Sequence, residues 1–419
     1  MPYPRFRVNM TLSELGTSLK SIFLGIEGDS PEAFSLALKK FGQFLNVVLV
    51  GSGRAGFRLL LESLDFKPNS EIIFPAYTFH PIPLVTMECG LKPVFADVDK
   101  QTWNIDPKKI VPLINERTKA IMPTHLFGVP ADMEAIDKIA RSHGLFVIED
   151  CAHALGATYR DKLVGNFGDA ALFTFAMSKN LPCWGGGAMI LKDRDLGIKM
   201  MERIAEGEAP SGCTVLKRQR SNVAALLFTQ PMLFPWTLYP ALRIADLSGS
   251  DYFDRPFLEP IPSGEKDEAV SLELQPGDKG RISGISPFQA EVGLRQLTKF
   301  SGRLEKQVRN ARLLRDYLAG CAGLELQKEP VDSCSSFLYV RIRVENPERA
   351  RHQLLMKGVD SKPDDMRNCA DLDIFSSQSD CPNAQRLGGH CVEIPCSPFY
   401  SESTIKNIAE KVREAASRF

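Results

Sequence analysis

The sequence predicts an α/β fold: a mostly parallel seven-stranded sheet flanked by helices, followed by a smaller α+β domain. Short apolar runs bounded by turn residues alternate with helical stretches through the first two hundred residues, which is typical of a parallel sheet covered on both faces. Two of these runs, 145–148 and 170–175, are followed by Glu149-Asp150 and by Ser178-Lys179. The length of 419 residues suits two domains of unequal size.

Charge and composition exclude some classes of protein. Lys and Arg together number 51, as do Asp and Glu, so the formal net charge is zero. A nucleic-acid-binding surface needs a basic excess, and we expect none here. A hydrophobic content of 44% is ordinary for a globular enzyme.

The ten cysteines are scattered, with no CxxC pair and no zinc-type Cys/His spacing. We therefore expect a reducing, cytoplasmic environment and no metal. The first fifteen residues contain basic side chains but no continuous apolar core, so they do not read as a signal peptide.

The elements of the first half follow in order. Ser30-Pro31 predicts the start of a helix that reaches about residue 44, because serine caps helices and proline suits their first turn. The expected strands are 47–50, 71–75, 92–98, 120–126, 145–148, 170–175 and 188–191, and the expected helices are 57–64, 107–115, 132–143 and 195–207.

A glycine-rich turn at 51–56 joins the first strand to its helix. Exposed backbone N–H groups and the helix dipole make such a turn a candidate anion site. It is neither a GxGxxG motif nor a Walker A loop. A tight turn without a ligand explains it equally well.

The stretch 208–280 departs from the alternating pattern. Its segment 221–242 has no charged residue but contains three prolines, which argue against a plain transmembrane helix. Either it is a buried helical insert that covers a site or a subunit interface, or it lies in a membrane surface beside the basic run 217–220. Residues 248–280 are rich in Gly, Pro, Ser and acids and predict an extended loop.

The second half predicts a smaller α+β domain. A long amphipathic helix runs from Ser286 to about Leu318, and its apolar stripe is Leu294, Leu297, Phe300, Leu304, Val308 and Leu313. An alternating strand at 337–344, a helix at 348–357, a strand at 392–395 and a helix at 403–417 follow. We expect a large domain with an N-terminal arm at 1–207, the insert at 208–280 and the small domain at 281–419.

Four features at successive strand ends point to one chemistry: the turn 53–55, Phe79, Asp150 and Lys179. An aldehyde cofactor with a phosphate and a pyridine ring needs a lysine for an imine and a carboxylate against the ring nitrogen. It also needs a glycine-rich helix start for the phosphate and an apolar face for the ring. Each feature alone has an ordinary structural explanation, so the hypothesis depends on their order along one α/β domain.

Longer motifs surround these positions. They are GSGRA at 51–55, PAYTF at 75–79, PVFADV at 93–98, NIDP at 104–107, HLFG at 125–128, ADM at 131–133, EDCAHALGA at 149–157, GD at 168–169, SKNL at 178–181 and SPFQA at 286–290. On these motifs the chain resembles the DegT/StrS-type sugar aminotransferases, fold-type I enzymes that use pyridoxal 5′-phosphate. The resemblance covers roughly residues 30–200 and 285–415.

The resemblance implies roles around the cofactor ring. Lys179 would form the Schiff base and then move the proton between the substrate α-carbon and the cofactor. Asp150 would hold the pyridinium nitrogen. Ala152 would pack under the ring, Phe79 would stack on its other face, and His153 would lie near the ring hydroxyl, where many relatives have Gln.

The resemblance also implies a phosphate site. Gly53, Arg54 and Ala55 would meet the phosphate largely through backbone N–H groups, and Thr174 through its hydroxyl. Ser178 is a secondary candidate. The family often has Thr at the position of Arg54, whose guanidinium could add a contact to the phosphate or turn outward.

The implied reaction is ping-pong. An amino acid, with glutamate first, leaves its amine on the cofactor, and a keto sugar, usually nucleotide-linked, then takes it. The resemblance further implies a homodimer with the site at the interface. If the segment 221–242 lies on a membrane, we expect a peripheral contact with the inner face of that membrane.

Three departures from the family pattern fall near the substrate. A Leu-Pro-Cys-Trp run at 181–184 follows Lys179, residues 281–284 replace an Asn-Tyr-Arg motif, and the stretch 208–280 is unusually long. Alternatives are a pyridoxal phosphate-dependent dehydratase or lyase, an aminotransferase acting on a lipid-linked or other non-nucleotide substrate, and a non-catalytic scaffold. Sugar dehydratases of this scaffold carry His in place of the lysine, so Lys179 argues against that variant.

Overall fold

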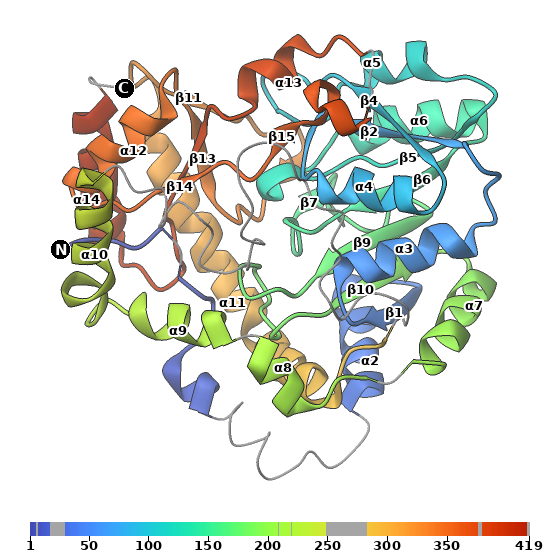
Figure 1. The fold of residues 1–419 in the computed structure, drawn as a ribbon, viewed down its shortest axis with the longest axis horizontal. Coiled ribbons are helices and arrows are strands. Elements are labelled where there is room, and N and C mark those ends of the chain that lie inside the picture. Colours follow the sequence, from blue (N-terminus) through green and yellow to red (C-terminus); the bar gives the residue numbers. More distant parts are fainter. Residues whose placement is uncertain are drawn as a thin grey trace.

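The computed structural model describes residues 1–5, 7–16, 30–207, 209–218, 220–248, 283–375 and 379–416. The predicted loop at 248–280 lies almost entirely outside these residues, as do two residues of the 281–284 departure. In Figure 1 the helices α3, α4 and α6 surround the strands of a sheet on one side of the molecule, and α11 runs between that sheet and the C-terminal elements.

The large sheet has seven strands in the order β1-β10-β9-β6-β5-β2-β4. Strand β10 runs antiparallel to both of its neighbours, and the other pairs are parallel. This confirms the predicted mostly parallel seven-stranded sheet. The bounds are β1 Asn46–Val50, β2 Glu71–Pro75, β4 Lys92–Ala96, β5 Thr118–Ile121, β6 Phe146–Asp150, β9 Ala170–Thr174 and β10 Gly187–Leu191.

Both faces of this sheet are covered, because alternate residues of each strand point to opposite sides. In β2, Ile72 and Phe74 join the core beneath α3, α4 and α7, whereas Ile73 joins the core beneath α6. Helix α2 and the first half of α11 cover the β9–β10 end of the second face. These helices are α2 Ser30–Gly42, α3 Gly53–Ser63, α4 Pro81–Glu88, α6 Met133–His143 and α7 Arg194–Ala205.

Several predicted bounds shift by a few residues, since α3 begins at Gly53 and β13 at Val340, and two elements end early at a proline. The helix expected at 107–115 is α5 Pro107–Ile110 followed by the 3₁₀ turn η1 Val111–Leu113, which contains Pro112. The strand expected at 120–126 is β5, which ends before Pro123, and the 3₁₀ turn η2 Leu126–Gly128 follows. Proline has no N–H donor and so interrupts both kinds of ladder.

The C-terminal part contains a four-stranded antiparallel sheet in the order β11-β13-β16-β14. Its strands are β11 Glu325–Leu326, β13 Val340–Arg343, β14 Lys362–Pro363 and β16 Cys391–Ile394. Helices α11 Pro287–Leu318, α12 Pro347–Met356 and α14 Glu402–Ala416 pack around it. The division into domains at 207 and 281 stays a prediction.

Helix α11 begins where the sequence predicts, since Ser286 and Gln289 form a reciprocal capping box. Its predicted apolar stripe is only partly right. Phe300 is buried, but the five other positions are half-buried, and the polar side chains Gln296, Gln307 and Asn310 are buried instead. The side-chain NH₂ groups of Gln307 and Asn310 donate to backbone carbonyl groups, whereas Gln307 Oε1 is buried without a partner among the described residues.

Smaller elements connect the two parts. Strand β15 Arg367–Asn368 pairs with β3 Tyr77–Thr78, and α13 Pro382–Leu387 packs against the large domain. A three-stranded sheet joins β12 Ser333–Cys334 to β7 Thr158–Tyr159 and β8 Lys162–Leu163. C-terminal segments therefore reach back onto the large domain.

The insert folds into α8 Gly212–Arg218, α9 Arg220–Phe228, the 3₁₀ turn η3 Phe234–Trp236 and α10 Leu238–Leu247. Pro231 and Pro235 lie between α9 and α10, where the apolar run is interrupted. Among the described helices, none has both the length and the apolar character needed to cross a membrane.

Candidate active site

Asp150 and Lys179 converge at one edge of the large sheet. Asp150 ends β6, and Lys179 lies in the turn after β9, the parallel neighbour of β6. Because parallel strands end at the same edge, the two side chains come close enough for the charge of Lys179 to lower the pKa of Asp150. The carboxyl edge of an open α/β sheet is also where ligands bind.

The Asp150 carboxylate is buried, with 4% of the residue exposed. Burial raises its pKa, and this outweighs the N–H of Ala152 at 3.0 Å, the charge of Lys179 and the Thr124 hydroxyl, which lower it. A buried carboxylate of this kind is stabilised as an anion by a further cationic group. Asp150 is therefore suited to hold a ligand N–H⁺.

Glu149 fixes the end of β6 from the opposite face. Its carboxylate accepts N–H bonds from Gly165 at 2.8 Å and from Phe167 and Gly168 at 2.7 Å. His125 lies 3.1 Å away through Nε2, and its Nδ1 accepts the N–H of Ala131, so Nε2 carries the proton. These contacts position the strand end.

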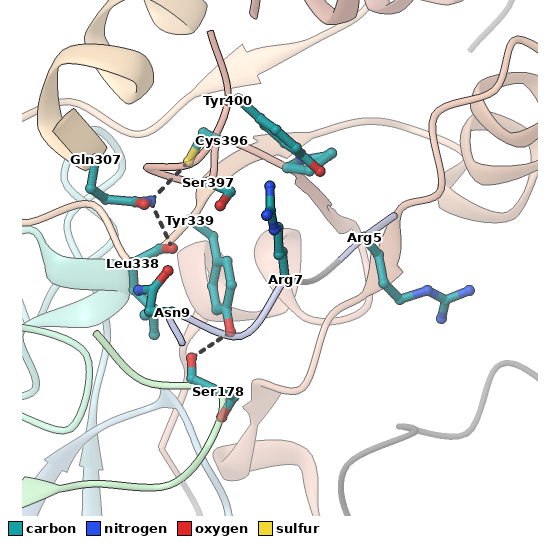
Figure 2. A pocket seen from close by; sticks show the side chains of 11 residues that line it. Arg5, Arg7, Asn9, Ser178, Gln307, Leu338, Tyr339, Cys396, Ser397 and Tyr400 are labelled. Atoms are coloured by element: carbon teal, nitrogen blue, oxygen red, sulfur yellow. Dashed lines mark hydrogen bonds between the residues drawn. The ribbon is translucent and has the colours of Figure 1, made fainter. Parts of the chain in front are cut away.

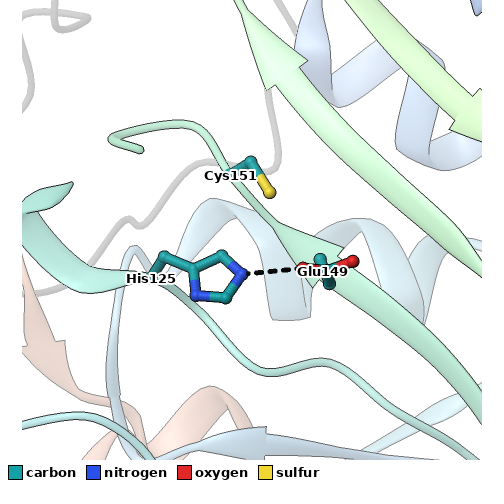
Figure 3. Close-up of side chains that lie close together, drawn as sticks. All are labelled: His125, Glu149 and Cys151. Atoms are coloured by element: carbon teal, nitrogen blue, oxygen red, sulfur yellow. Dashed lines mark hydrogen bonds and ion pairs between the residues drawn. The ribbon is translucent and has the colours of Figure 1, made fainter. Parts of the chain in front are cut away.

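Figure 3 shows His125 pointing at Glu149, with the Cys151 thiol nearby. The three donor atoms lie within 4.8 Å of one another, the one such group among the residues described. Both ring nitrogens of His125 are already used by Glu149 and Ala131, and burial raises the pKa of the Cys151 thiol well above its usual value. The arrangement suits a structural role better than a metal site.

His153 lies near Lys179 and is neutral. Its ring stacks on Phe127 with centroids 5.8 Å apart, and its Nδ1 accepts the N–H of Phe127 at 3.3 Å. Burial, followed by the charges of Lys179 and Arg341, lowers the pKa of His153 well below its usual value. A neutral imidazole that accepts at Nδ1 carries its proton on Nε2 and can donate there.

The predicted phosphate turn opens α3. Gly53 stands against Thr174, because an added Cβ would lie 3.3 Å from the Thr174 Cβ, so the structure brings these two positions together. The N–H of Ala55 is taken by the Ser52 side chain at 3.2 Å, an N-cap that the sequence analysis missed. Arg54 lies near His80, whose pKa falls to about 4 through burial, Arg367 and Arg54.

The remaining predicted positions are half-buried. Phe79 directly follows β3, and its ring is tilted against that of His80 at 5.9 Å. Ala152 lies in the turn after β6. Ser178 receives the Tyr339 hydroxyl on its backbone carbonyl at 2.8 Å, a contact visible in Figure 2.

Figure 2 also shows the Arg7 side chain beside Tyr339, with its guanidinium directed toward Tyr400 and away from Ser178. A pocket here is lined by Arg5, Arg7, Asn9, Ser178, Gln307, Leu338, Tyr339, Pro395, Cys396, Ser397 and Tyr400. The Arg7 guanidinium lies over the Phe399 ring at 4.6 Å, and among the described residues none forms an ion pair with it. The Nε of Arg7 and the hydroxyl of Tyr400 are buried without partners there.

A buried charge network was missed by the sequence analysis. The alternating pattern at 337–344 predicts a strand but not the burial of Arg341, of which 3% is exposed. It pairs with Asp364 at 2.6 Å and with Glu393 at 3.2 Å, and it lies 4.1 Å from the Phe127 ring centroid. An arginine inside an apolar strand was the only signal in the sequence.

The sequence profile of the DegT/DnrJ/EryC1/StrS aminotransferase family matches residues 9–214 and 263–413. The chain belongs to this family. Members of the DegT/DnrJ/EryC1/StrS family depend on pyridoxal 5′-phosphate.

Two relatives illustrate the range of the family. The pleiotropic regulatory protein of Geobacillus stearothermophilus is 40% identical over 170 residues, which are 41% of this chain and 46% of that protein. The GDP-perosamine synthase of Caulobacter vibrioides is 39% identical over 176 residues, 41% of this chain and 47% of that one. The alignments thus span about half the length of these relatives.

Solved structures share the whole fold. Helicobacter pylori PseC, an aminotransferase involved in the biosynthesis of pseudoaminic acid, superposes with a TM-score of 0.76 at 19% identity, with 100% of both chains covered. The fold-type I architecture predicted from the sequence is confirmed.

The residues of the site fit the family's cofactor. Asp150 is a buried carboxylate whose pKa stays raised by burial despite the nearby charge of Lys179, and His153 is a neutral donor beside Lys179. A Cβ at Gly53 would lie tightly against Thr174, and the glycine suits a close approach of the backbone to a phosphate.

Proposed function

We propose that this chain is a pyridoxal phosphate-dependent aminotransferase that moves an amino group from an amino acid, with glutamate as first candidate, to a nucleotide-linked keto sugar. The observation that carries the proposal is the convergence of Asp150 and Lys179 at the ends of the paired strands β6 and β9. The name of the Caulobacter vibrioides relative, a GDP-perosamine synthase, supports a sugar nucleotide as acceptor.

Pyridoxal phosphate supplies an electron sink that stabilises negative charge at the substrate α-carbon. Asp150 would hold the pyridine nitrogen protonated, and the N–H of Ala152 keeps this carboxylate in place while hydrogen bonds to Glu149 fix the strand end. His153 would donate its Nε2–H to the ring hydroxyl. Gly53, Arg54 and Thr174 would hold the phosphate.

Lys179 moves the proton. Its Nζ takes the proton from the donor α-carbon in the first half-reaction and delivers one to the carbon of the keto sugar in the second. The amino group would stay on the cofactor while the first product leaves, before the keto sugar binds, so the kinetics would be ping-pong.

Arg7 binds a carboxylate of the amino donor. Arg7 and Ser178 line the same pocket, and among the described residues none neutralises the guanidinium. An arginine fork matches a carboxylate with two parallel hydrogen bonds. Burial lowers the pKa of Arg7 but leaves the group charged.

The working unit is a homodimer with its site at the interface. Asn180, next to Lys179, is buried with both amide atoms unpartnered among the described residues, so a group from outside this chain would complete it. Free thiols at all ten cysteines support a reducing, cytoplasmic location. Light scattering of the purified protein tests the dimer.

The decisive experiment combines spectroscopy with a product assay. The wild-type protein loaded with pyridoxal phosphate shows a visible absorption band, which glutamate bleaches with release of 2-oxoglutarate. Lys179→Ala lacks the lysine-dependent band and the release. A wild-type band that no amino acid bleaches contradicts transamination and favours the lyase or the scaffold.

A further inference from the structure

The insert presents large apolar side chains to solvent. We call them the apolar ridge, and they are Leu227, Phe228, Met232, Leu233, Trp236, Ile244 and Leu247. Met232 and Trp236 are each 85% exposed, Ile244 69% and Leu247 68%. Single exposed apolar residues are ordinary, but seven within 21 positions of one segment mark an interaction surface.

The ridge is not needed to hold the insert in place. On its inner side, Phe234 and Leu242 pack against Leu355 of α12. The Tyr239 hydroxyl donates to the Leu355 carbonyl at 2.9 Å, and Asp246 pairs with His352 at 2.7 Å. Helix α10 is therefore anchored to α12 by one face and still carries Ile244 and Leu247 on its outside, so both faces are apolar.

The net charge of the segment that contains the apolar ridge indicates which kind of partner binds to it. Residues 209–247, which contain the ridge, include Lys217, Arg218, Arg220 and Arg243 against one acidic residue, Asp246, a formal charge of +3. A second copy bound through the same patch would place this net positive segment on both sides of a twofold interface. An anionic lipid surface accepts both the cations and the apolar side chains, and tryptophan favours the membrane interface.

The same segment touches the active-site turn. Val215 of α8 and Leu226 of α9 belong to the buried cluster that contains Met177 and Trp184, which flank Lys179 in the chain. In Figure 1, α8, α9 and α10 follow one another along a single edge of the molecule, beside α11, α12 and α14. A surface that engages the ridge would therefore lie beside the turn that carries Lys179.

We propose that the apolar ridge docks the protein on the surface of an anionic lipid bilayer, with the side chains of the ridge at the headgroup boundary. This inference does not depend on the proposed reaction. It makes a lipid-linked keto sugar an accessible substrate in addition to a soluble one.

The test uses full-length protein and vesicles of phosphatidylcholine, with or without an equal part of phosphatidylglycerol. We expect co-sedimentation with the phosphatidylglycerol vesicles at low salt, about tenfold above that with phosphatidylcholine alone and weaker in high salt. Met232→Ser/Trp236→Ser should lose about tenfold or more of this binding. Lys217→Gln/Arg218→Gln/Arg220→Gln should lose the preference for phosphatidylglycerol.

The matched control is Ile198→Ser/Met201→Ser, which removes two exposed apolar side chains from α7 and should bind as wild type does. Thermal unfolding of the ridge variant and of the control should be unchanged, because Met232, Trp236, Ile198 and Met201 are exposed. Absence of wild-type binding at low salt, or unchanged binding by the ridge variant, overturns the proposal. A dimer that dissociates in the ridge variant, without lipid binding by wild type, assigns the ridge to a second copy.

Discussion

The hydroxyl of Tyr339 donates a 2.8 Å hydrogen bond to the backbone carbonyl of Ser178, the residue before Lys179. Burial raises the pKa of Tyr339 well above its usual value, so the hydroxyl keeps its proton as a donor. The C-terminal part of the chain thereby holds the turn that carries the candidate catalytic lysine.

Tyr339→Phe removes this bond with little change in volume. A misplaced catalytic group costs turnover more than binding, so we expect kcat to fall about tenfold with KM nearly unchanged. Steady-state kinetics measure both kcat and KM. The control is Tyr239→Phe in the insert, which loses an equivalent hydrogen bond to the Leu355 carbonyl of α12. Equal kcat values in the two variants would remove any special role for Tyr339.

Asp150→Asn keeps the size of the side chain but removes its charge. We expect kcat to fall at least about a hundredfold and the cofactor to bind more weakly, because the ring nitrogen loses its anionic partner. Turnover and cofactor titration measure the two effects. Asp132→Asn is the control, since Asn caps α6 as well as Asp does. Full activity of Asp150→Asn would exclude the proposed contact.

His153→Gln preserves a neutral donor, whereas His153→Leu does not. Since the pKa of His153 lies well below its usual value, the imidazole stays neutral from pH 6 to 9 and adds no step to the rate profile. We expect His153→Gln to keep the wild-type shape of the pH–rate profile and much of the activity, and His153→Leu to lose about tenfold. A step near neutral pH that disappears in His153→Gln would show that His153 titrates.

Glu393→Gln should flatten the dependence of stability on pH. Burial raises the pKa of Glu393 to about 7, against an ordinary value of 4.5. Between these values the folded state retains a proton that the unfolded state has lost, so this group lowers wild-type stability as pH rises from about 4.5 to about 7, by on the order of 3 kcal/mol.

The measurement is the free energy of unfolding of Glu393→Gln and wild type at several pH values. The two curves should converge at low pH and separate above neutral pH, with the variant the more stable, while Asp364 still pairs with Arg341. A variant less stable than wild type at pH 8 would mean that the ionised Glu393–Arg341 pair is net stabilising.

Arg7→Gln tests the binding of the amino donor. We expect the KM for glutamate to rise about tenfold or more with a smaller change in kcat, because a charged hydrogen bond to the carboxylate is lost. Arg5→Gln removes the same charge from the same arm, but from a pair with Asp360 at 2.8 Å. An equal rise of the KM for glutamate in the two variants would indicate that the N-terminal arm as a whole, rather than Arg7, affects binding of the amino donor.

Much of the fold could be predicted from the sequence, because its elements depend on local pattern. The period of the apolar residues, the Ser286 cap and the glycine turn specify strands and helices within a few residues of one another. The positions of Asp150 and Lys179 followed as well, since parallel strands place their carboxyl ends at one edge. The predicted bounds of the helix at 107–115 and of the strand at 120–126 were wrong, because prolines interrupt both elements.

Only the tertiary structure brought together groups that are distant in the chain. Arg341, Asp364 and Glu393 form one buried network, and Tyr339 reaches Ser178 across 161 positions. The tertiary structure likewise determines which side of the insert is covered by α12 and which side forms the apolar ridge. Local pattern reports what a residue prefers, whereas burial and pairing are set by the other elements that fold against it, and the sequence of one segment does not contain that partner.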